Sequence, residues 1–257
     1  MRNILIGLFC LATMGANAQI VDSVKKDLFT APDTVKHLHS TPLSLAIPTG
    51  LITYGVLSFA VNPIRNFDYT VNNEIVRTAP NFNTKTENFF QFAPIIMVYG
   101  LNLVGVNGKN TFIDRTALLG LSGAFLGASA YITKSATHRL RPNGSDYLSF
   151  PSGHTSTAFL GAEFLAQEYT GKSVWYGLIG YGIAATTGAF RLYNHDHWFS
   201  DVVAGAGYGV LSTKLSYLVY PYIRNALTHT NNKTGKKTVL TPSYQDGTMS
   251  FTFAKEL

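Results

Sequence analysis

The sequence predicts an all-α fold: a bundle of about six helices, embedded in a membrane, followed by a short strand-like tail. Only 13% of the 257 residues are charged, against roughly 25% in ordinary soluble domains. Charged residues are absent from several long intervals that are rich in Gly, Ala, Leu and Ile. Small residues recur there and let helices pack closely, as in membrane bundles. They are Gly123, Ala124, Gly127, Ala128, Gly180, Gly182, Gly205 and Gly207.

The first 18 residues have the pattern of a secretory signal peptide. Arg2 supplies a positive start, residues 4–14 form a short apolar core, and residues 16–18 are a small-residue cleavage pattern. The core is too short to span a bilayer comfortably, although an ordinary buried N-terminal helix stays open. The single cysteine, Cys10, lies in this segment, so we expect a mature chain without disulfides or cysteine chemistry.

Six helices are expected after a polar, charged lead at residues 19–40. Five come from uncharged intervals near the length of a membrane span. These are 41–62, 89–108, 116–133, 173–190 and 202–213, the last extended past Lys214 to residue 223. A sixth, shorter helix is expected over 152–169. We therefore assign 41–224 to one helical domain, with a soluble all-α bundle still open because the mean hydropathy is only +0.10.

Residues 225–257 form a tail with a different pattern. Met249, Phe251 and Phe253 alternate with polar residues after a turn at 245–247. Such alternation is typical of a strand, so we expect a short strand-like segment in this tail.

Three clusters of residues could handle a phosphate, and the first holds Lys134 and Arg141. Their spacing is close to two helical turns, so both are expected on one helix face, with Pro142 ending or kinking the helix. Two cations there repel each other unless an anion lies between them, since the next acid, Asp146, follows the proline. Arg141 would donate bidentate hydrogen bonds and Lys134 would act as a point charge. The alternative is a solvated helix end.

The second cluster is Pro151-Ser152-Gly153-His154, directly before a helical run at 155–169. Ser152 is a good N-cap residue, and Gly153 lets a ligand approach the backbone. Free N–H groups at a helix start favour an anion, and His154 would then reach an oxygen of a phosphate ester. The alternative is a capped helix with an exposed histidine.

The third cluster holds Arg191, His197 and Asp201. His197 and Asp201 are four residues apart, so on a helix they would share a face. A carboxylate on one ring nitrogen would fix the tautomer and leave the other nitrogen as a nucleophile. Arg191 adds a third cation. The alternative is a surface pair, worth about 0.3–0.5 kcal/mol.

Taken together and in order, the clusters resemble the three signature motifs of the type-2 phosphatidate phosphatase and vanadium haloperoxidase superfamily. The resemblance covers roughly residues 89–217, with the motif core at 134–201. The wider pattern is similar to exported lipid phosphatases of Gram-negative bacteria, lipid A 4'-phosphatases among them. One position departs from the family: a serine usually precedes the third-motif arginine, and here it is Phe190, which removes one hydroxyl.

The resemblance implies a metal-independent phosphatase without a cofactor, which acts through a phosphohistidine at one end of the bundle. His197, held by Asp201, would attack phosphorus. His154 would protonate the leaving alkoxide and then activate the water. Five residues would hold the phosphoryl oxygens: Lys134, Arg141, Ser152, Gly153 and Arg191.

The net charge of +6 favours anionic partners, and nucleic acid is not expected because no basic run interleaved with aromatic residues is present. If 41–62 crossed the membrane after an exported N-terminus, the Lys134 cluster would face the cytoplasm. If 41–62 lies in the interface or packs laterally, all three clusters face the periplasm. The basic turns at 109–115, 170–172 and beyond 224 then lie inside, in agreement with the positive-inside rule.

We therefore expect a lipid-linked phosphomonoester or pyrophosphate as substrate, on the periplasmic side of the inner membrane. Candidates are lipid A, undecaprenyl pyrophosphate, phosphatidylglycerol phosphate and phosphatidate, and the resemblance leans toward the 4'-phosphate of lipid A. A soluble periplasmic acid phosphatase is the alternative. The sequence does not indicate the oligomeric state.

Three other functions stay open. His195-Asp196-His197 with Asp201 could bind zinc, but we find no complementary ligands, and the cations would repel a metal ion. A haloperoxidase would use His197 as its vanadate ligand, but the chain is short for that class. A third alternative only binds lipid head groups. Around the site we expect His138, His195 and Asp196 at the rim, and Trp198 and Phe199 in packing.

Overall fold

The computed structural model describes residues 42–228, 238–245 and 248–255, with side chains described over 43–224. The expected signal peptide and polar lead lie outside these residues. The helices are η1 (Pro42–Leu45), α2 (Ala46–Leu57), α3 (Asn62–Thr78), α4 (Glu87–Phe90), α5 (Ala93–Leu103), α6 (Phe112–Thr137), α7 (Gly153–Tyr169), α8 (Val174–Tyr193) and α9 (Phe199–Thr228). The all-α prediction is confirmed, because each of the six expected intervals contains a helix. Helix α3 and the single turn α4 were not expected.

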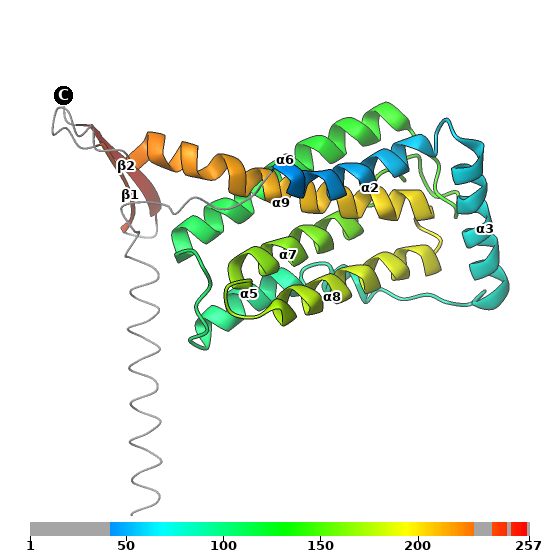
Figure 1. Ribbon diagram of the computed structural model, residues 1–257, viewed down its shortest axis with the longest axis horizontal. Coiled ribbons are helices and arrows are strands. Elements are labelled where there is room, and N and C mark those ends of the chain that lie inside the picture. The colour runs from blue at the N-terminus through cyan, green and yellow to red at the C-terminus, as the bar shows by residue number, and fades with distance from the viewer. Residues whose placement is uncertain (1–41, 229–237, 246–247, 256–257) are drawn as a thin grey trace, which may run out of the picture.

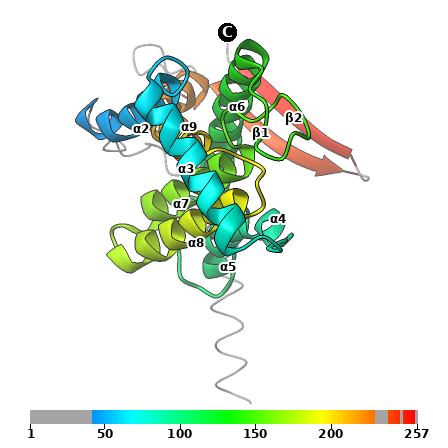
Figure 2. The same cartoon turned by 90° about the vertical axis from the view of Figure 1, so that its right-hand side faces the viewer.

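Helices α7 and α9 form the centre of the bundle (Figure 1). Helix α7 packs against α5, α8 and α9, and α9 also packs against α2 and α6. Helix α3 crosses the end of the bundle at which α9 begins (Figures 1 and 2). This arrangement brings the end of α6, the start of α7, the end of α8 and the start of α9 to the same end of the molecule.

Two described helices are long and apolar enough to cross a membrane, namely α6 and the segment Phe199–Arg224 of α9. Leu43–Leu57 and Asn62–Thr78 would make a third span only as a pair bent by 87°. Helix α5 has 11 residues and α2 has 12, so the expectation that each uncharged interval has spanning length is wrong for these two. In α6 only 17% of the apolar window is buried inside the protein, which leaves most of it to face outward.

The expected close packing at glycines occurs around α9. A Cβ atom at Gly205 would lie 2.8 Å from the Ser152 carbonyl oxygen, and one at Gly207 would lie 2.6 Å from the Pro48 carbonyl oxygen. Side chains there would push α7 and α2 away from α9, so these positions set how near the start of α7 and helix α2 lie to α9. The expectation is wrong where a Cβ would meet nothing within 4 Å, which is the case at Gly123, Gly127 and Gly182.

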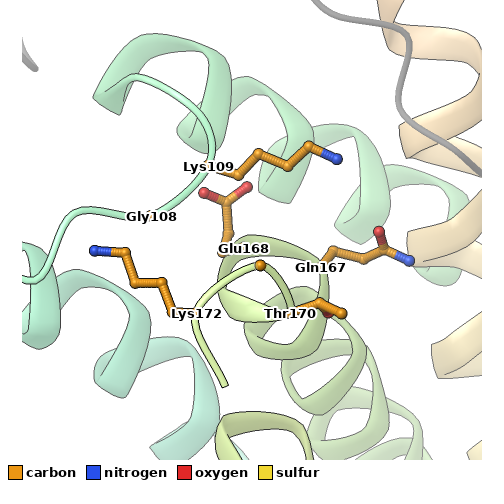
Figure 3. A pocket seen from close by; sticks show the side chains of 7 residues that line it. Gly108, Lys109, Gln167, Glu168, Thr170 and Lys172 are labelled. Carbon is orange, nitrogen blue, oxygen red and sulfur yellow. The ribbon is translucent and has the colours of Figure 1, made fainter. Parts of the chain in front are cut away.

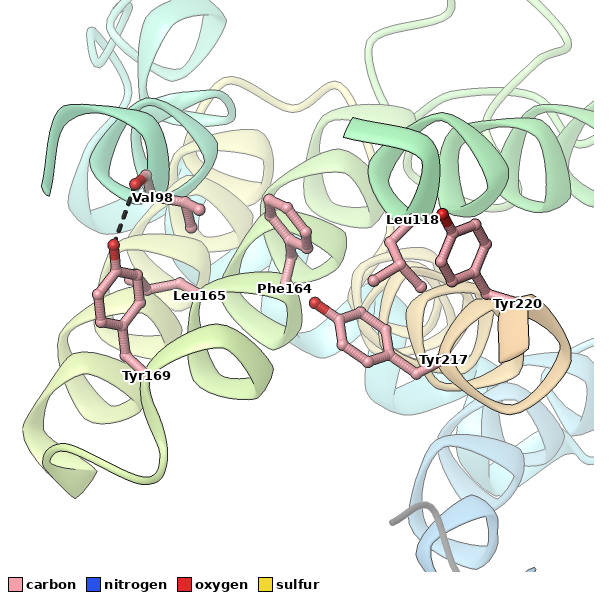
Figure 4. Close-up of a cluster of buried hydrophobic side chains, with 7 residues drawn as sticks. All are labelled: Val98, Leu118, Phe164, Leu165, Tyr169, Tyr217 and Tyr220. Carbon is pink, nitrogen blue, oxygen red and sulfur yellow. Dashed lines mark hydrogen bonds between the residues drawn. The ribbon is translucent and has the colours of Figure 1, made fainter. Parts of the chain in front are cut away.

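The main apolar cluster joins α5, α6, α7 and α9 (Figure 4). Its buried members are Val98, Leu118, Phe164, Leu165, Tyr169, Tyr217 and Tyr220. The Tyr169 hydroxyl donates to the Val98 carbonyl oxygen at 3.1 Å, so its polar tip is satisfied while the ring packs. Each fully buried leucine contributes about 1.5–3 kcal/mol, and this cluster therefore fixes the scaffold on which the opposite end is built.

The tail contains two antiparallel strands, β1 (Thr238–Gln245) and β2 (Thr248–Lys255). Thr238 pairs with Lys255 and Gln245 with Thr248. The expected strand-like pattern is confirmed, and its apolar positions 249, 251 and 253 lie in β2. Two of the expected turn residues, at 246 and 247, lie outside the described residues.

Candidate active site

The three clusters converge at the α3 end of the bundle. A guanidinium nitrogen of Arg141 lies 3.2 Å from the His197 ring, and the Lys134 ammonium donates to the Pro151 carbonyl oxygen at 2.7 Å. The Ser152 backbone N–H donates to the Asp201 carbonyl oxygen at 3.1 Å. Residues from all three parts of the sequence thus share one region.

His197 is held with its Nε2 toward a cation. Its Nδ1 lies 2.7 Å from the Ser149 carbonyl oxygen, which only accepts, so Nδ1 carries the proton. Nε2 then keeps its lone pair and accepts from Arg141 Nη1. The side chain is buried, and this burial lowers the pKa of His197 below its ordinary value, although Asp201 raises it. The ring is therefore a neutral imidazole with a lone pair available for attack.

Asp201 supports His197 differently from the expected hydrogen-bonded pair. His197 precedes α9 and Asp201 lies in the first turn of this helix, so the two do not share one helix face. Asp201 Oδ2 lies 3.7 Å from His197 Nδ1, which is too far for a hydrogen bond. It accepts instead from the Ser149 hydroxyl and from the Trp198 N–H. Asp201 thus fixes the loop whose Ser149 carbonyl binds the ring, and it supplies negative charge nearby.

Arg139 connects Asp201 to α3, and sequence reasoning missed it. Its Nη1 donates to Asp201 Oδ1 at 2.7 Å, and its Nη2 donates to Asp68 Oδ2 at 2.7 Å. Asp68 also accepts from the Ser200 N–H at 2.8 Å. Arg139 falls between the two motif cations, where a helix was expected. Asp68 lies on a helix that was not expected, so no local pattern could have paired them.

Lys134 and Arg141 do not project from one helix face. Helix α6 ends at Thr137, where His138 takes a left-handed conformation with φ 42° as the helix cap, so Arg141 lies in the following loop. The chain turns back so that Asp146 Oδ1 accepts from Arg141 Nε at 2.7 Å. The acid that the linear spacing seemed to exclude is therefore the partner of Arg141. The Lys134 ammonium donates to two backbone carbonyl oxygens, those of Leu148 and Pro151.

The second cluster begins a helix as expected. Helix α7 starts at Gly153, and Ser152 occupies the N-cap position. Its hydroxyl makes no capping bond and pairs instead with the Thr155 hydroxyl at 2.9 Å. The side chain therefore does not cap the helix start, where backbone N–H groups favour an anion.

His154 is positioned by a residue outside the three clusters. Its Nε2 lies 2.7 Å from Asn88 Oδ1, and since a carbonyl oxygen accepts, Nε2 carries the proton. Burial, followed by the charges of Arg191 and His197, lowers the pKa of His154 to about 4. In the free protein His154 is therefore a neutral imidazole whose Nδ1 can accept a proton. An anion placed among the cations would favour its protonated form.

Arg191 lies in the last turn of α8 and is held by two carboxylates. Its Nη1 lies 3.0 Å from Glu87 Oε1 and 2.9 Å from Asp196 Oδ2. Among the described side chains, only two buried polar atoms have no hydrogen-bond partner, and both belong to this ion pair: Arg191 Nε and Glu87 Oε2. Phe190 occupies the position where the resembled family usually has serine. It packs against Phe90, with ring centroids 6.2 Å apart, so it holds α4 against α8.

The zinc alternative does not match the geometry. His195 Nδ1 lies 2.8 Å from Asn72 Oδ1, while Asp196 contacts Arg191 and the His197 ring contacts Ser149. These side chains point to separate partners, and no group of three potential metal ligands occurs in the described part of the chain.

The expected packing of Trp198 and Phe199 is confirmed, because Trp198 packs edge-on against Tyr69 and Phe199 against Phe67.

Sequence comparison finds relatives that are named phosphatases, which agrees with the phosphate-binding groups gathered here. A lipid A 1-phosphatase from Porphyromonas gingivalis is 32% identical over 232 residues, 90% of this chain, but the chain spans only 48% of that relative. A probable lipid phosphate phosphatase 4 from Arabidopsis thaliana is 37% identical over 93 residues, which cover 31% of this chain and 30% of that relative.

A crystal structure of a transmembrane PAP2-type phosphatidylglycerolphosphate phosphatase from Bacillus subtilis has the same fold. The TM-score is 0.52 at 19% identity, over 69% of this chain and 97% of that one. The model of the PAP2 superfamily matches residues 115–225, a range that includes the three clusters and nearly all of α6 to α9. Residues 115–225 of this chain therefore form a domain of the PAP2 superfamily.

Proposed function

We propose that the protein is a phosphatase that hydrolyses a lipid-linked phosphomonoester or pyrophosphate without a metal ion. The observation that carries the proposal is the state of His197, whose unprotonated Nε2 lies 3.2 Å from the Arg141 guanidinium. A phosphoryl group bound by Arg141 would lie beside this lone pair. Lys134 and Arg191 add two more cations for the phosphoryl oxygens, and His154 adds a group that can exchange a proton. Together these residues complete a site for phosphoryl transfer.

The first step is attack on phosphorus. His197 Nε2 forms the bond to phosphorus while the bond from phosphorus to the ester oxygen breaks, and His154 protonates the departing alkoxide. Lys134, Arg141 and Arg191, with the start of α7 at Ser152 and Gly153, stabilise the charge on the phosphoryl oxygens. One such preplaced donor contributes about 3–4 kcal/mol to transition-state stabilisation, so charge stabilisation is the largest contribution.

The second step releases phosphate. His154, having given up its proton, accepts one from a water molecule that attacks the phosphohistidine, and the bond from phosphorus to Nε2 breaks. General acid and base catalysis of this kind contributes about 100- to 10,000-fold. The proposed roles follow the sequence expectation except that Asp201 acts mainly through Ser149.

We further propose that the domain is embedded in the inner membrane with the site facing the periplasm. The span-length helices α6 and α9 support embedding. The basic residues at 109–115 and 170–172 lie at the end of the bundle opposite the site, which suits a cytoplasmic position under the positive-inside rule. Carbonate extraction of membranes tests embedding, and release of the protein into the supernatant would exclude it.

Lipid A is the first substrate to test. The sequence pattern favoured the 4'-phosphate, whereas the relative that matches most of this chain is named a lipid A 1-phosphatase. Both positions therefore belong in the assay, with undecaprenyl pyrophosphate, phosphatidylglycerol phosphate and phosphatidate beside them.

The test is phosphate release by the purified protein in detergent with EDTA present. We expect release from at least one of these lipids, inhibition by vanadate, and no release by His197→Ala of unchanged thermal stability. Substantial activity in that variant would reject the assigned nucleophile. Failure of the wild-type protein on every lipid would favour a protein that only binds head groups.

A further inference from the structure

The short turn α4 places a carboxylate in the candidate site from outside the PAP2-matched segment. Glu87 is 2% exposed, and its Oε1 accepts from Arg191 at 3.0 Å and from Asn194 Nδ2 at 3.0 Å. The next residue, Asn88, accepts from His154 at 2.7 Å. One helical turn thus touches a phosphate-binding candidate and the acid–base candidate.

The ion pair between Glu87 and Arg191 is incomplete on both sides. Glu87 Oε2 is a buried acceptor without a donor, and Arg191 Nε is a buried donor without an acceptor. A buried polar group that is left unpaired has lost its hydrogen bonds to water without replacing them, so it destabilises the protein. A ligand that presents an acceptor and a hydrogen-bond donor side by side would satisfy both atoms.

A phosphomonoester with one proton is such a ligand. Its unprotonated oxygens accept from arginine, and its P–OH group donates to a carboxylate. The second pKa of a phosphomonoester is about 6, so this form is present in substantial amounts near neutral pH. A fully ionised phosphate cannot donate, and it would be repelled by the Glu87 carboxylate.

We propose that Glu87 is a binding residue that selects the monoprotonated form of the phosphoryl group, through Oε2 as acceptor for the P–OH hydrogen beside Arg191 Nε. This rests on the proposed function. It means that a phosphate enters the site together with one proton.

The charged groups around Glu87 come from three directions. Helix α8 contributes Arg191, the loop after it contributes Asp196, which shares Arg191 at 2.9 Å, and α7 contributes His154 through Asn88. Helix α5, which also packs on α4, has no acidic or basic side chain. Besides Glu87, His154 and Asp196 are the two of these groups that could take up a proton when an anion binds.

The test measures the affinity for inorganic phosphate between pH 6 and pH 9, with no turnover required. If only the protonated form binds, the apparent Kd rises about tenfold per pH unit above the second pKa of phosphate. We expect this slope in the wild-type protein and its loss in Glu87→Gln, whose amide can donate to the ionised form. Asp196→Asn is the matched control: it removes a carboxylate from the same arginine, leaves Glu87 in place, and should keep the slope.

The variants separate the possible proton acceptors, because Asp196→Asn tests Asp196 and His154→Gln tests His154. A slope that persists in Glu87→Gln but disappears in His154→Gln would overturn the proposal and assign the proton to His154. If Glu87→Gln does not fold, Glu87→Asp is used, and it should bind more weakly with the slope retained; a lost slope there would also count against the proposal.

The outcomes also separate this inference from the proposed function. A wild-type protein that releases phosphate from a lipid, with equal slopes in wild type and Glu87→Gln, would overturn only the role of Glu87. A wild-type protein that neither releases phosphate nor binds inorganic phosphate would remove both.

Discussion

Buried charges gather near the two ends of α7, and they are used in opposite ways. His154 and Glu168 are 14 residues apart on this helix, which corresponds to about 21 Å. Glu168 accepts from Arg115 Nε at 3.2 Å, from the Asn110 N–H at 3.1 Å and from the Tyr217 hydroxyl at 2.7 Å. At the His154 end, Glu87 and Arg191 keep one unpaired atom each.

The opposite end also has a cavity, beside a carboxylate that protein groups already bind. A cavity of 570 Å³ lies beside Glu168, between Lys109 and Lys172 (Figure 3). Both Glu168 oxygens are already bound by protein groups. Asp114 at the same end likewise accepts from Tyr220 at 2.7 Å and Arg224 at 2.6 Å. Paired charges join helices, whereas incompletely paired charges leave hydrogen bonds for a ligand.

The comparison of the two ends of α7 predicts the largest effect on stability at the Glu168 end, where the buried charges are paired. Glu168→Ala leaves Arg115 as a buried charge without its carboxylate, which costs about 3–5 kcal/mol. We expect the free energy of unfolding in detergent to fall by this amount, while the phosphate release per folded molecule is retained. Unchanged stability would contradict a structural role, and lost activity in the folded fraction would contradict the separation of the two ends.

At the His154 end of α7, where charges are incompletely paired, a substitution should lower the catalytic efficiency. Arg191→Gln removes one donor to the phosphoryl group, and we expect kcat/KM to fall about 100- to 1,000-fold, or ~3–4 kcal/mol. Arg77→Gln is the matched control, since Arg77 is exposed and pairs only with Glu74 on α3. Equal activities of these two variants would show that Arg191 does not act on the substrate.

A smaller effect is expected at Asn88. Asn88→Ala removes the acceptor that orients His154, so we expect about a tenfold loss of kcat. Asn88→Asp places a carboxylate at the same position, which raises the pKa of His154 from about 4 because it stabilises the imidazolium. The alkaline limb of the kcat profile, where the acid form of His154 is lost, should move to higher pH. A shift to lower pH would contradict His154 as the acid.

The sequence predicted which clusters lie together better than it predicted the contacts between them. The three clusters at 134–201 meet as expected because each carries a local signal: a proline, a helix start or a fixed spacing. Asp68, Glu87 and Asn88 were missed, since each acts on a partner at least 66 residues away, and no periodicity marks such a contact. Arg139 was passed over because a helix was expected through it, and the left-handed His138 ends that helix.

The helix lengths were overestimated for a similar reason. An uncharged interval shows where charge is excluded, but it does not show where the backbone turns. The interval 89–108 is divided between the end of α4 and α5, with Pro94 in the first turn of α5. The interval 41–62 ends in a bend of 87°. These breaks place α3 and α4 across the candidate site, where Asp68 reaches Arg139 and Asn88 reaches His154.

The central claim is that His197 Nε2 becomes bonded to phosphorus. The most direct measurement mixes the protein with a substrate that carries a radioactive phosphate, quenches the reaction at early times in alkali, and maps the label by peptide analysis. We expect up to one label per chain on His197, stable in alkali and lost in acid, and absent in His197→Ala. Label on another residue, or label that persists in His197→Ala, would contradict the account.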